Sequence, residues 1–406
     1  MARIVQKFGG SSLKNPKFID NAASIICQEA NSGNEVVAVV SAMGKTTDEL
    51  LNLASSLNDN PNLRELDMLL ASGEQVSSAL MSIAIQKRGL QARAFTGIQA
   101  KILTDTNHGE ASIKEIETDS IEASLSRGEI AVVAGFQGSF AQNEITTLGR
   151  GGSDTTAVAL AYAIDAERCD IYTDVAGVYT GDPHLIENSK MIKAISYDEM
   201  YEMAISGAKV LNANSVELAK KYEVPVRVRS TFEPDNIGTL VTHKIFTPTR
   251  HLTSLSLDLS QSLVSLKMVH NTENLDFVSS LFTRLAELKI SIDMFMMIAP
   301  EDNLNFELVF AIANKEIAKL NQIINEDNIK QKFKSVEIKE KLAKISLIGS
   351  QLNLRSDVIA QLFELVKANK TKLHLVATSD LRVSILVDRE KSKSLINLIH
   401  NNFFNI

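Results

Sequence analysis

Short continuous apolar runs recur through roughly the first 240 residues, and stretches with apolar residues at helical spacing separate them. Continuous runs of Val, Ile and Ala are typical of parallel strands that helices cover on both faces. We therefore predict a layered α/β domain with a mainly parallel sheet. The expected strands are Ile4–Phe8, Glu35–Val40, Ala92–Phe95, Ile130–Phe136, Asp170–Thr173 and Pro225–Val228.

Capping residues mark several helix starts in this part of the chain. Asn15 is suited to the N-cap of a helix whose first residue is a proline. Ser196 and Glu199 have the spacing of a capping box. A long helical stretch from Leu63 to Arg88 contains Gly73, which costs roughly 1 kcal/mol relative to alanine. Close approach of some other group at this glycine is therefore expected.

The pattern changes after residue 241, where residues 242–251 read as a linker. Two weakly similar units follow, each a strand–helix–strand–strand pattern with a further amphipathic helix. The first unit has Leu263–Val269, a helix near Leu275–Leu288, Ile290–Met297 and Asn305–Ala311. The second has Lys344–Ile348, a helix near Asp357–Ala368, Lys372–Ala377 and Leu381–Val387. We expect domains at residues 1–241, 252–335 and 336–406, with C-terminal strands as candidates to complete the first small unit.

Two glycine-rich turns and one polar loop carry the candidate chemistry. The first turn, residues 9–12 (Gly-Gly-Ser-Ser), follows the opening strand, and Lys7 precedes it. Glycines let backbone N–H groups close around an anion, and a lysine supplies a point charge for phosphate. Because the lysine comes before the turn, this is not the G-x-x-x-x-G-K-[ST] loop. The second turn is residues 148–156 (Leu-Gly-Arg-Gly-Gly-Ser-Asp-Thr-Thr), and the polar loop is residues 172–183.

These three segments, in this order, resemble the aspartate kinases of the amino acid kinase family. The likeness continues through residues 195–200, 206–211, 226–232 and 238–241. The C-terminal units resemble a tandem pair of ligand-sensing ACT domains. The resemblance implies a three-layer α/β/α kinase domain followed by two ferredoxin-like βαββαβ ACT domains. It also implies transfer of the ATP γ-phosphoryl group to the side-chain carboxylate of L-aspartate, the first step toward lysine, threonine and methionine.

The resemblance assigns catalysis to Lys7, which would steady the transferring phosphoryl group, and to Asp154, which would orient that lysine and the substrate amine. Arg150 offers a planar fork for bidentate capture of the aspartate α-carboxylate. The plain alternatives at these positions are a strand-end lysine, a helix N-cap and a solvated arginine.

The same resemblance assigns the substrate and nucleotide sites. Ser41, Thr47 and Glu74 match positions that line the aspartate pocket with Arg150 and Asp154, although Glu74 alone reads as a solvated helix residue. The positions that match the ATP site are Lys7, Gly9, Gly10, Ser11, Thr173, Asp174, Tyr179, Asp182 and Lys209. A carboxylate acceptor, with a pKa of about 4, is already ionised, so no general base is needed. Mg²⁺ is expected to arrive with ATP rather than in a protein metal site.

Composition narrows the function classes. A formal net charge of −7 over 406 residues argues against a nucleic-acid partner. Cys27 and Cys169 lie in segments that read as a buried helix and a buried strand, so reduced core thiols are expected. The seven histidines have no ligand-like spacing. No leader and no apolar run of membrane-spanning length is recognised, which predicts a cytoplasmic enzyme without a membrane partner.

The chain departs from the family pattern at several positions. Ala176 replaces a frequent acidic residue and His184 a frequent arginine, and residues 212–214 (Asn-Ala-Asn) replace a His-Pro pair. In the first ACT unit, residues 271–274 lack the usual glycine turn, and Met297 stands where a glutamine is common. We therefore hypothesise that feedback inhibition by lysine or threonine is weak, altered or absent.

Other functions remain open at this point. One is an amino acid kinase acting on glutamate, acetylglutamate or carbamate, against which the two glycine turns and the tandem C-terminal units argue. Another is a non-catalytic amino acid sensor, against which the presence of Lys7, Arg150 and Asp154 argues. Tandem ACT units predict a homodimer, although some relatives instead pair a full chain with a short C-terminal one.

Overall fold

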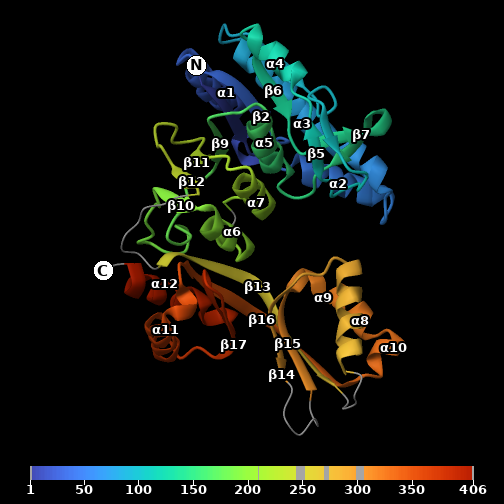
Figure 1. Ribbon diagram of the computed structural model, residues 1–406, viewed down its shortest axis with the longest axis vertical. Helices are drawn as coiled ribbons and strands as arrows, with labels where there is room; N and C mark the ends of the chain where they lie inside the picture. The colour runs from blue at the N-terminus through green and yellow to red at the C-terminus, as the bar shows by residue number, and fades with distance from the viewer. Residues whose placement is uncertain (1, 209, 244–251, 269–273, 299–305, 405–406) are drawn as a thin grey trace. The chain divides into compact units, whose positions relative to one another are not determined.

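The computed structural model describes residues 2–208, 210–243, 252–268, 274–298 and 306–404 (Figure 1), and the chain forms two compact units. The first unit comprises Met1–Tyr179, Met191–Ile205 and Lys209–Pro248. The second comprises Thr180–Lys190, Ser206–Ala208 and Thr249–Ile406. Most of the expected linker lies outside the described residues.

An eight-stranded sheet forms the centre of the first unit, in the order β10-β12-β11-β9-β1-β2-β6-β3. All neighbouring strands in it pair in parallel except β11 with β12. The strands are β1 (Arg3–Phe8), β2 (Glu35–Val40), β3 (Ala92–Phe95), β6 (Ile130–Ala134), β9 (Arg168–Thr173), β10 (Ala194–Ser196), β11 (Val226–Ser230) and β12 (Thr239–Thr242). Every strand predicted for this part of the chain lies in the sheet, so the predicted mainly parallel sheet is confirmed.

Seven helices accompany this sheet in the described part of the first unit, and α1 and α6 begin where the capping residues predict. They are α1 (Pro16–Asn31), α2 (Thr46–Leu57), α3 (Leu63–Gln86), α4 (Asp119–Ser126), α5 (Gly152–Ala163), α6 (Tyr197–Ile205) and α7 (Ala213–Lys221). The Asn15 side chain accepts a hydrogen bond from the Phe18 N–H (3.1 Å) at the start of α1. Ser196 and Glu199 each accept from the other's backbone N–H at 3.2 Å, which confirms the capping box.

A small four-stranded sheet, in the order β5-β4-β7-β8, was not predicted. Its strands are β4 (Ile102–Thr104), β5 (Ile113–Ile116), β7 (Gln137–Phe140) and β8 (Glu144–Thr147). Each has only three or four residues, and β5 has no buried residue. Strands this short carry too little alternation to be recognised from sequence.

The second unit is built on a six-stranded sheet in the order β14-β15-β13-β16-β18-β17. Its strands are β13 (Leu252–Met268), β14 (Ile292–Ile298), β15 (Phe306–Ala313), β16 (Phe333–Gly349), β17 (Leu373–Thr378) and β18 (Arg382–Asp388). Its helices are α8 (Asn274–Glu287), α9 (Ile317–Ile324), α10 (Asp327–Lys330), α11 (Ser356–Ala368) and α12 (Arg389–Phe404). The repeated strand–helix–strand–strand order predicted from the sequence is confirmed.

The sequence predicted only part of each of the two long strands of this unit. β13 and β16 have 17 residues each and run antiparallel along nearly their whole length. The first half of β13 packs with α11 and α12 in one core, and its second half packs with α8 and α9 in another. Figure 1 shows these two helix groups beside opposite halves of the strands. The opening half of β13 therefore packs in the core of the C-terminal helices, and its second half packs in the core of α8 and α9.

The 180–190 segment lies within the second unit, although its first four residues belong to the polar loop at residues 172–183. Ile186 is in a buried cluster with Leu255 and Ile399. The Asn397 side chain donates a hydrogen bond to the Leu185 carbonyl (2.9 Å). These contacts join residues far apart in the chain, which is why the sequence pattern did not predict them.

One expectation needs correction, because α3 is long and apolar enough by composition to cross a membrane. Half of its apolar window is buried inside the protein. The helix also carries two buried carboxylates, Asp67 and Glu74. In this structure α3 is a core helix of the first unit.

Candidate active site

The carboxyl ends of three adjacent strands bring the first predicted site residues together. β1 pairs with β2 on one side and β9 on the other. The Gly9 N–H donates to the Tyr172 carbonyl of β9 (3.2 Å), and the Ser41 N–H donates to the Phe8 carbonyl of β1 (3.1 Å). In parallel sheets ligands bind at this end of the strands. The first glycine turn, Ser41 and the end of β9 therefore border one site.

Gly10 is required by close approach of backbone. A Cβ at this position would lie 2.9 Å from the Ala42 carbonyl oxygen and 3.0 Å from that of Gly44. The Gly44 N–H also donates to the Gly10 carbonyl (3.0 Å). The turn after β1 is thus pressed against the loop after β2, with no room for a side chain at Gly10.

Lys7 and Asp154 form an ion pair, with Lys7 Nζ 2.5 Å from Asp154 Oδ1. Both residues are 9% exposed. Asp154 lies in the first turn of α5, but the N-cap is Gly151 at φ 76°, so the plain N-cap interpretation of Asp154 is wrong. Asp154 Oδ1 is buried, and its charged partner among the described residues is the Lys7 ammonium. The ammonium and the carboxylate therefore fix each other's position at the end of β1.

Glu74 is buried, only 3% exposed, rather than solvated. Its Oε1 accepts a hydrogen bond from the Ala42 N–H (2.9 Å), and its Oε2 has no hydrogen-bond partner within the described part of the chain. Burial raises the pKa of Glu74 to about 7, although the Ala42 N–H opposes that shift. A Cβ on Gly73 would lie 2.9 Å from the Ala42 Cβ, which confirms the close approach expected at this glycine.

Arg150 lies in the second glycine turn and is exposed. Gly149 and Gly151 on either side have φ of 70° and 76°, a conformation that favours glycine. The Asn212 side chain donates to the Arg150 carbonyl (3.0 Å), and its own Oδ1 accepts from the Asn214 N–H at the start of α7. Asn212, one of the departures from the family pattern, therefore supports the turn that carries Arg150.

The remaining aspartate and nucleotide positions are less enclosed. Thr47 is half-buried in the first turn of α2, and Ser11 is exposed at the start of the turn after β1. Thr173 ends β9 and donates to the adjacent Asp174 carboxylate (3.0 Å). Tyr179 is half-buried, and burial raises its pKa.

Two predicted nucleotide positions do not lie among the described residues of the first unit. Asp182 belongs to the second unit, where its carboxylate accepts from the His184 N–H (2.9 Å). His184 is exposed, whereas Ala176, the other departure in this loop, is buried. Lys209 lies outside the described residues.

Three groups that support the candidate site residues through hydrogen bonds were not predicted from the sequence. These are the Ala42 N–H, the Asn212 side chain and the buried carboxylate of Asp67. The apolar context of Asp67 on a core helix was a usable signal, because carboxylates are almost never fully buried unless they are paired. Nothing in the sequence marks the other two.

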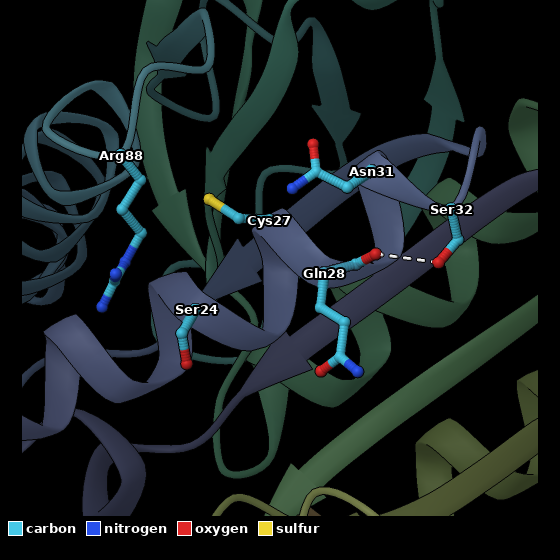
Figure 2. A pocket seen from close by; sticks show the side chains of 6 residues that line it. All are labelled: Ser24, Cys27, Gln28, Asn31, Ser32 and Arg88. Atoms are coloured by element: carbon cyan, nitrogen blue, oxygen red, sulfur yellow. Dashed lines mark hydrogen bonds between the residues drawn. The ribbon is translucent and has the colours of Figure 1, made fainter.

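A surface hollow on α1 lies apart from these residues. Figure 2 shows its lining, which is Ser24, Cys27, Gln28, Asn31, Ser32 and Arg88. Burial raises the pKa of the Cys27 thiol, although nearby Arg88 lowers it, so the thiol stays protonated at neutral pH. Cys169 is also an unbridged, buried cysteine, as predicted. None of the predicted site residues lines the hollow.

Comparisons with known proteins agree with this geometry. The model of the amino acid kinase family matches residues 2–230. Aspartokinase 2 of Bacillus subtilis is 40% identical over 403 residues, covering 99% of this chain and 98% of that protein. The aspartokinase of Geobacillus stearothermophilus is 41% identical over 403 residues, covering 99% and 97%.

A solved structure extends the likeness to the whole fold. E. coli aspartokinase III in complex with aspartate and ADP, in its R-state, has a TM-score of 0.84 at 26% identity, and the match covers 99% of both chains. The same enzyme with lysine and aspartate, in its T-state, has a TM-score of 0.76. The six-stranded C-terminal sheet and its helices have the repeated strand–helix–strand–strand order of tandem ACT domains. The chain therefore belongs to the amino acid kinase family, among its aspartokinases, which transfer the γ-phosphoryl group of ATP to the side-chain carboxylate of L-aspartate to give 4-phospho-L-aspartate and ADP.

Proposed function

We propose that L-aspartate and ATP react at the carboxyl ends of β1, β2 and β9, with Lys7 and Asp154 as the catalytic residues. The observation that carries this proposal is the ion pair of Lys7 and Asp154, which fixes a cation at the end of β1. The first turn of α5 adds the partial positive charge of a helix N-terminus. Phosphoryl transfer needs such charge, because negative charge spreads over the transferring oxygens.

The acceptor needs no deprotonation. An aspartate side chain, with a pKa of about 4, is a carboxylate near neutral pH and attacks the γ-phosphorus directly. Positioning and charge neutralisation are then what the protein contributes. Lys7 would stabilise the transferring group, and Asp154 would hold Lys7 and accept from the substrate ammonium.

The aspartate pocket would use groups of opposite charge for the two ends of the amino acid. Glu74 Oε2 is a buried acceptor without a partner in the described chain, which suits a substrate ammonium. Arg150 has no ion pair among the described residues and offers two parallel N–H donors to the α-carboxylate. Ser41 and Thr47 would supply hydroxyl groups at the side of the pocket.

The nucleotide would bind along the first glycine turn and the end of β9. Gly9, Gly10 and Ser11 would donate to phosphate oxygens, and Thr173, Asp174 and Tyr179 would contact the nucleoside side. Asp182 and Lys209 are proposed for this site on sequence resemblance alone. The exposed carboxylate of Asp174 is the kind of oxygen ligand that Mg²⁺ takes when phosphates supply the others. Bound Mg²⁺ would neutralise phosphate charge.

The test is ATP-dependent formation of aspartyl hydroxamate, because hydroxylamine traps the acyl phosphate. We expect signal with L-aspartate and none with L-glutamate, and Lys7→Ala should abolish it. Lys17→Ala is the matched control, since Lys17 is an exposed lysine on α1. Equal signal with glutamate would contradict the acceptor, and full turnover by Lys7→Ala would contradict the catalytic role.

Regulation and assembly are a second part of the proposal. The edge strand β14 exposes four consecutive apolar residues, Phe295, Met296, Met297 and Ile298. Exposed apolar edges of this kind pair with a second chain, so we propose a homodimer. Because Met297 replaces a hydrogen-bonding glutamine, lysine or threonine should bind weakly; residues 271–273 of the altered turn lie outside the described structure. Tight lysine binding in calorimetry would contradict this, and a monomer in light scattering would contradict the dimer.

We also propose a cytoplasmic location. The support is the pair of buried, unbridged cysteines, which suits a reducing compartment. Fractionation of cells that produce the protein would test it.

A further inference from the structure

Asp67 is a buried carboxylate that the proposed chemistry does not use. It lies on α3, seven positions before Glu74, which places both side chains on one face about two helical turns apart. Asp67 is wholly buried. A carboxylate removed from water is strongly destabilising unless donors surround it, so its partners show what it holds in place.

Both oxygens of Asp67 accept hydrogen bonds from segments that lie far away in the sequence. His108 Nδ1 is 2.7 Å from Oδ2, and the Gly109 N–H lies 3.1 Å from each oxygen. The Thr147 hydroxyl, at the end of β8, donates to Oδ1 at 2.5 Å. The Asp67 side chain therefore links α3 through hydrogen bonds to the loop at residues 107–110 and to the last residue of β8.

These two tied segments adjoin the turn that carries Arg150. Thr147 is followed by Leu148, Gly149 and Arg150, and its carbonyl accepts from the Ala111 N–H (2.9 Å). A Cβ on Gly149 would lie 3.3 Å from the Gly109 carbonyl oxygen. The backbone of the 107–110 loop therefore packs directly against the second glycine turn.

We propose that Asp67 is a positioning residue for aspartate binding, which holds the 107–110 loop and Thr147 so that the Gly149 turn presents Arg150 to the substrate α-carboxylate. The inference rests on the proposed role of Arg150. Helix α3 would then support the aspartate pocket in two places. Glu74 would contact the substrate, and Asp67 would position the turn that carries Arg150.

His108 takes part as a donor. Its Nδ1 faces the Asp67 carboxylate, which assigns the proton to that nitrogen, and its ring packs edge-on against Phe140 with centroids 5.7 Å apart. Replacing His108 by asparagine keeps a donor of shorter reach, whereas leucine removes it. We therefore expect His108→Leu to weaken aspartate binding more than His108→Asn.

The experiment is a steady-state comparison of the full-length enzyme and its variants, measuring kcat and the KM for each substrate. We expect Asp67→Asn to raise the KM for aspartate about tenfold, with kcat and the KM for ATP within about twofold of the parent. Arg64→Gln is the matched control, because it breaks an exposed ion pair with Glu144 at the start of β8. It should leave all three constants unchanged.

A double-mutant cycle separates positioning from general loosening of the fold. If Asp67 acts through Arg150, adding Asp67→Asn to Arg150→Ala should raise the KM for aspartate no further. Independent, multiplying effects, or equal rises in both KM values, would overturn the inference. If Arg150→Ala alone leaves the KM for aspartate unchanged, the assignment of Arg150 fails and the inference with it. Should Asp67→Asn fail to fold, the His108→Leu and His108→Asn pair provides the same test.

Discussion

Lys7 Nζ lies 2.5 Å from Asp154 Oδ1, and this ion pair joins the end of β1 to the first turn of α5. Both side chains are largely buried, so the charge of Lys7 is focused where a phosphate would bind. We expect Lys7→Ala to lower kcat by about a thousandfold, as removal of other transition-state charge donors does. Turnover by the hydroxamate assay checks it.

Lys7→Arg is the informative companion to that variant. It keeps the positive charge but replaces a compact ammonium by a larger planar group. Recovery of less than a tenth of the parent kcat would show that geometry matters beyond charge. Turnover by Lys7→Ala within tenfold of the parent would contradict the role of the pair.

The pKa of Glu74, about 7, predicts that aspartate binding depends on pH. The substrate ammonium needs the ionised carboxylate, and a pKa of about 7 leaves roughly one tenth of Glu74 ionised at pH 6 and nine tenths at pH 8. We expect the KM for aspartate to be about tenfold higher at pH 6 than at pH 8. Glu74→Gln should have a high KM at both values, and an unchanged parent KM across this range would refute the assignment.

The same raised pKa predicts that the stability of the fold decreases as pH rises, whereas aspartate binding should become stronger. Because the folded-state pKa lies above the unfolded value of 4.5, the unfolded chain loses this proton first as pH rises. Stability from protonated Glu74 is therefore present below about pH 4.5 and is lost as pH rises toward 7, by about 3 kcal/mol in all. Thermal unfolding without substrate should show Glu74→Gln gaining Tm relative to the parent between pH 5 and pH 8. A Tm difference that does not vary with pH would count against it.

A hydrogen bond between Thr180 and His400 anchors the 180–190 segment in the second unit. The Thr180 hydroxyl lies 2.8 Å from His400 Nε2, and His400 is fully buried. Thr180→Val would leave the imidazole without this partner, and the turn that carries Asp182 should loosen. Because Asp182 is proposed to contact ATP, we expect a KM for ATP raised about three- to tenfold, with the KM for aspartate unchanged.

Thr180→Ser is the control for that variant, because it keeps the hydroxyl. Burial, with a smaller contribution from Lys190, lowers the pKa of His400. The neutral imidazole therefore stabilises the fold above its unfolded pKa of 6.5, and this stability is lost as pH falls through the lower folded value. A Thr180→Val enzyme with the parent KM for ATP would show that the anchor does not reach the nucleotide.

The parallel sheet could be predicted because its information is local. β2 and β6 are mainly runs of apolar residues that stay buried on both faces, and the capping residues at Asn15 and Ser196 act within one turn. The short strands β4, β5, β7 and β8 could not be predicted, because three or four half-polar residues have no distinct period.

The candidate site likewise has a part that could be predicted from the sequence and a part that could not. Lys7 and the glycine turns could be singled out because phosphate binding favours glycines and a nearby positive charge, whereas the role of Asp154 was predicted from the resemblance to aspartate kinases. The hydrogen bond to Glu74 Oε1 and the four hydrogen bonds to Asp67 were not predicted, because their donors come from residues 32 to 80 positions away.

The sequence by itself therefore determined the order of the main strands and helices and the family, and it named the candidate site residues through the family resemblance. Tertiary structure alone decided which carboxylates are buried, where α3 approaches the loop after β2, and that the 180–190 segment belongs to the second unit. The physical reason is that periodicity and capping depend on neighbours within a few residues. Desolvation and hydrogen-bond satisfaction depend on whichever distant segment the fold brings into contact.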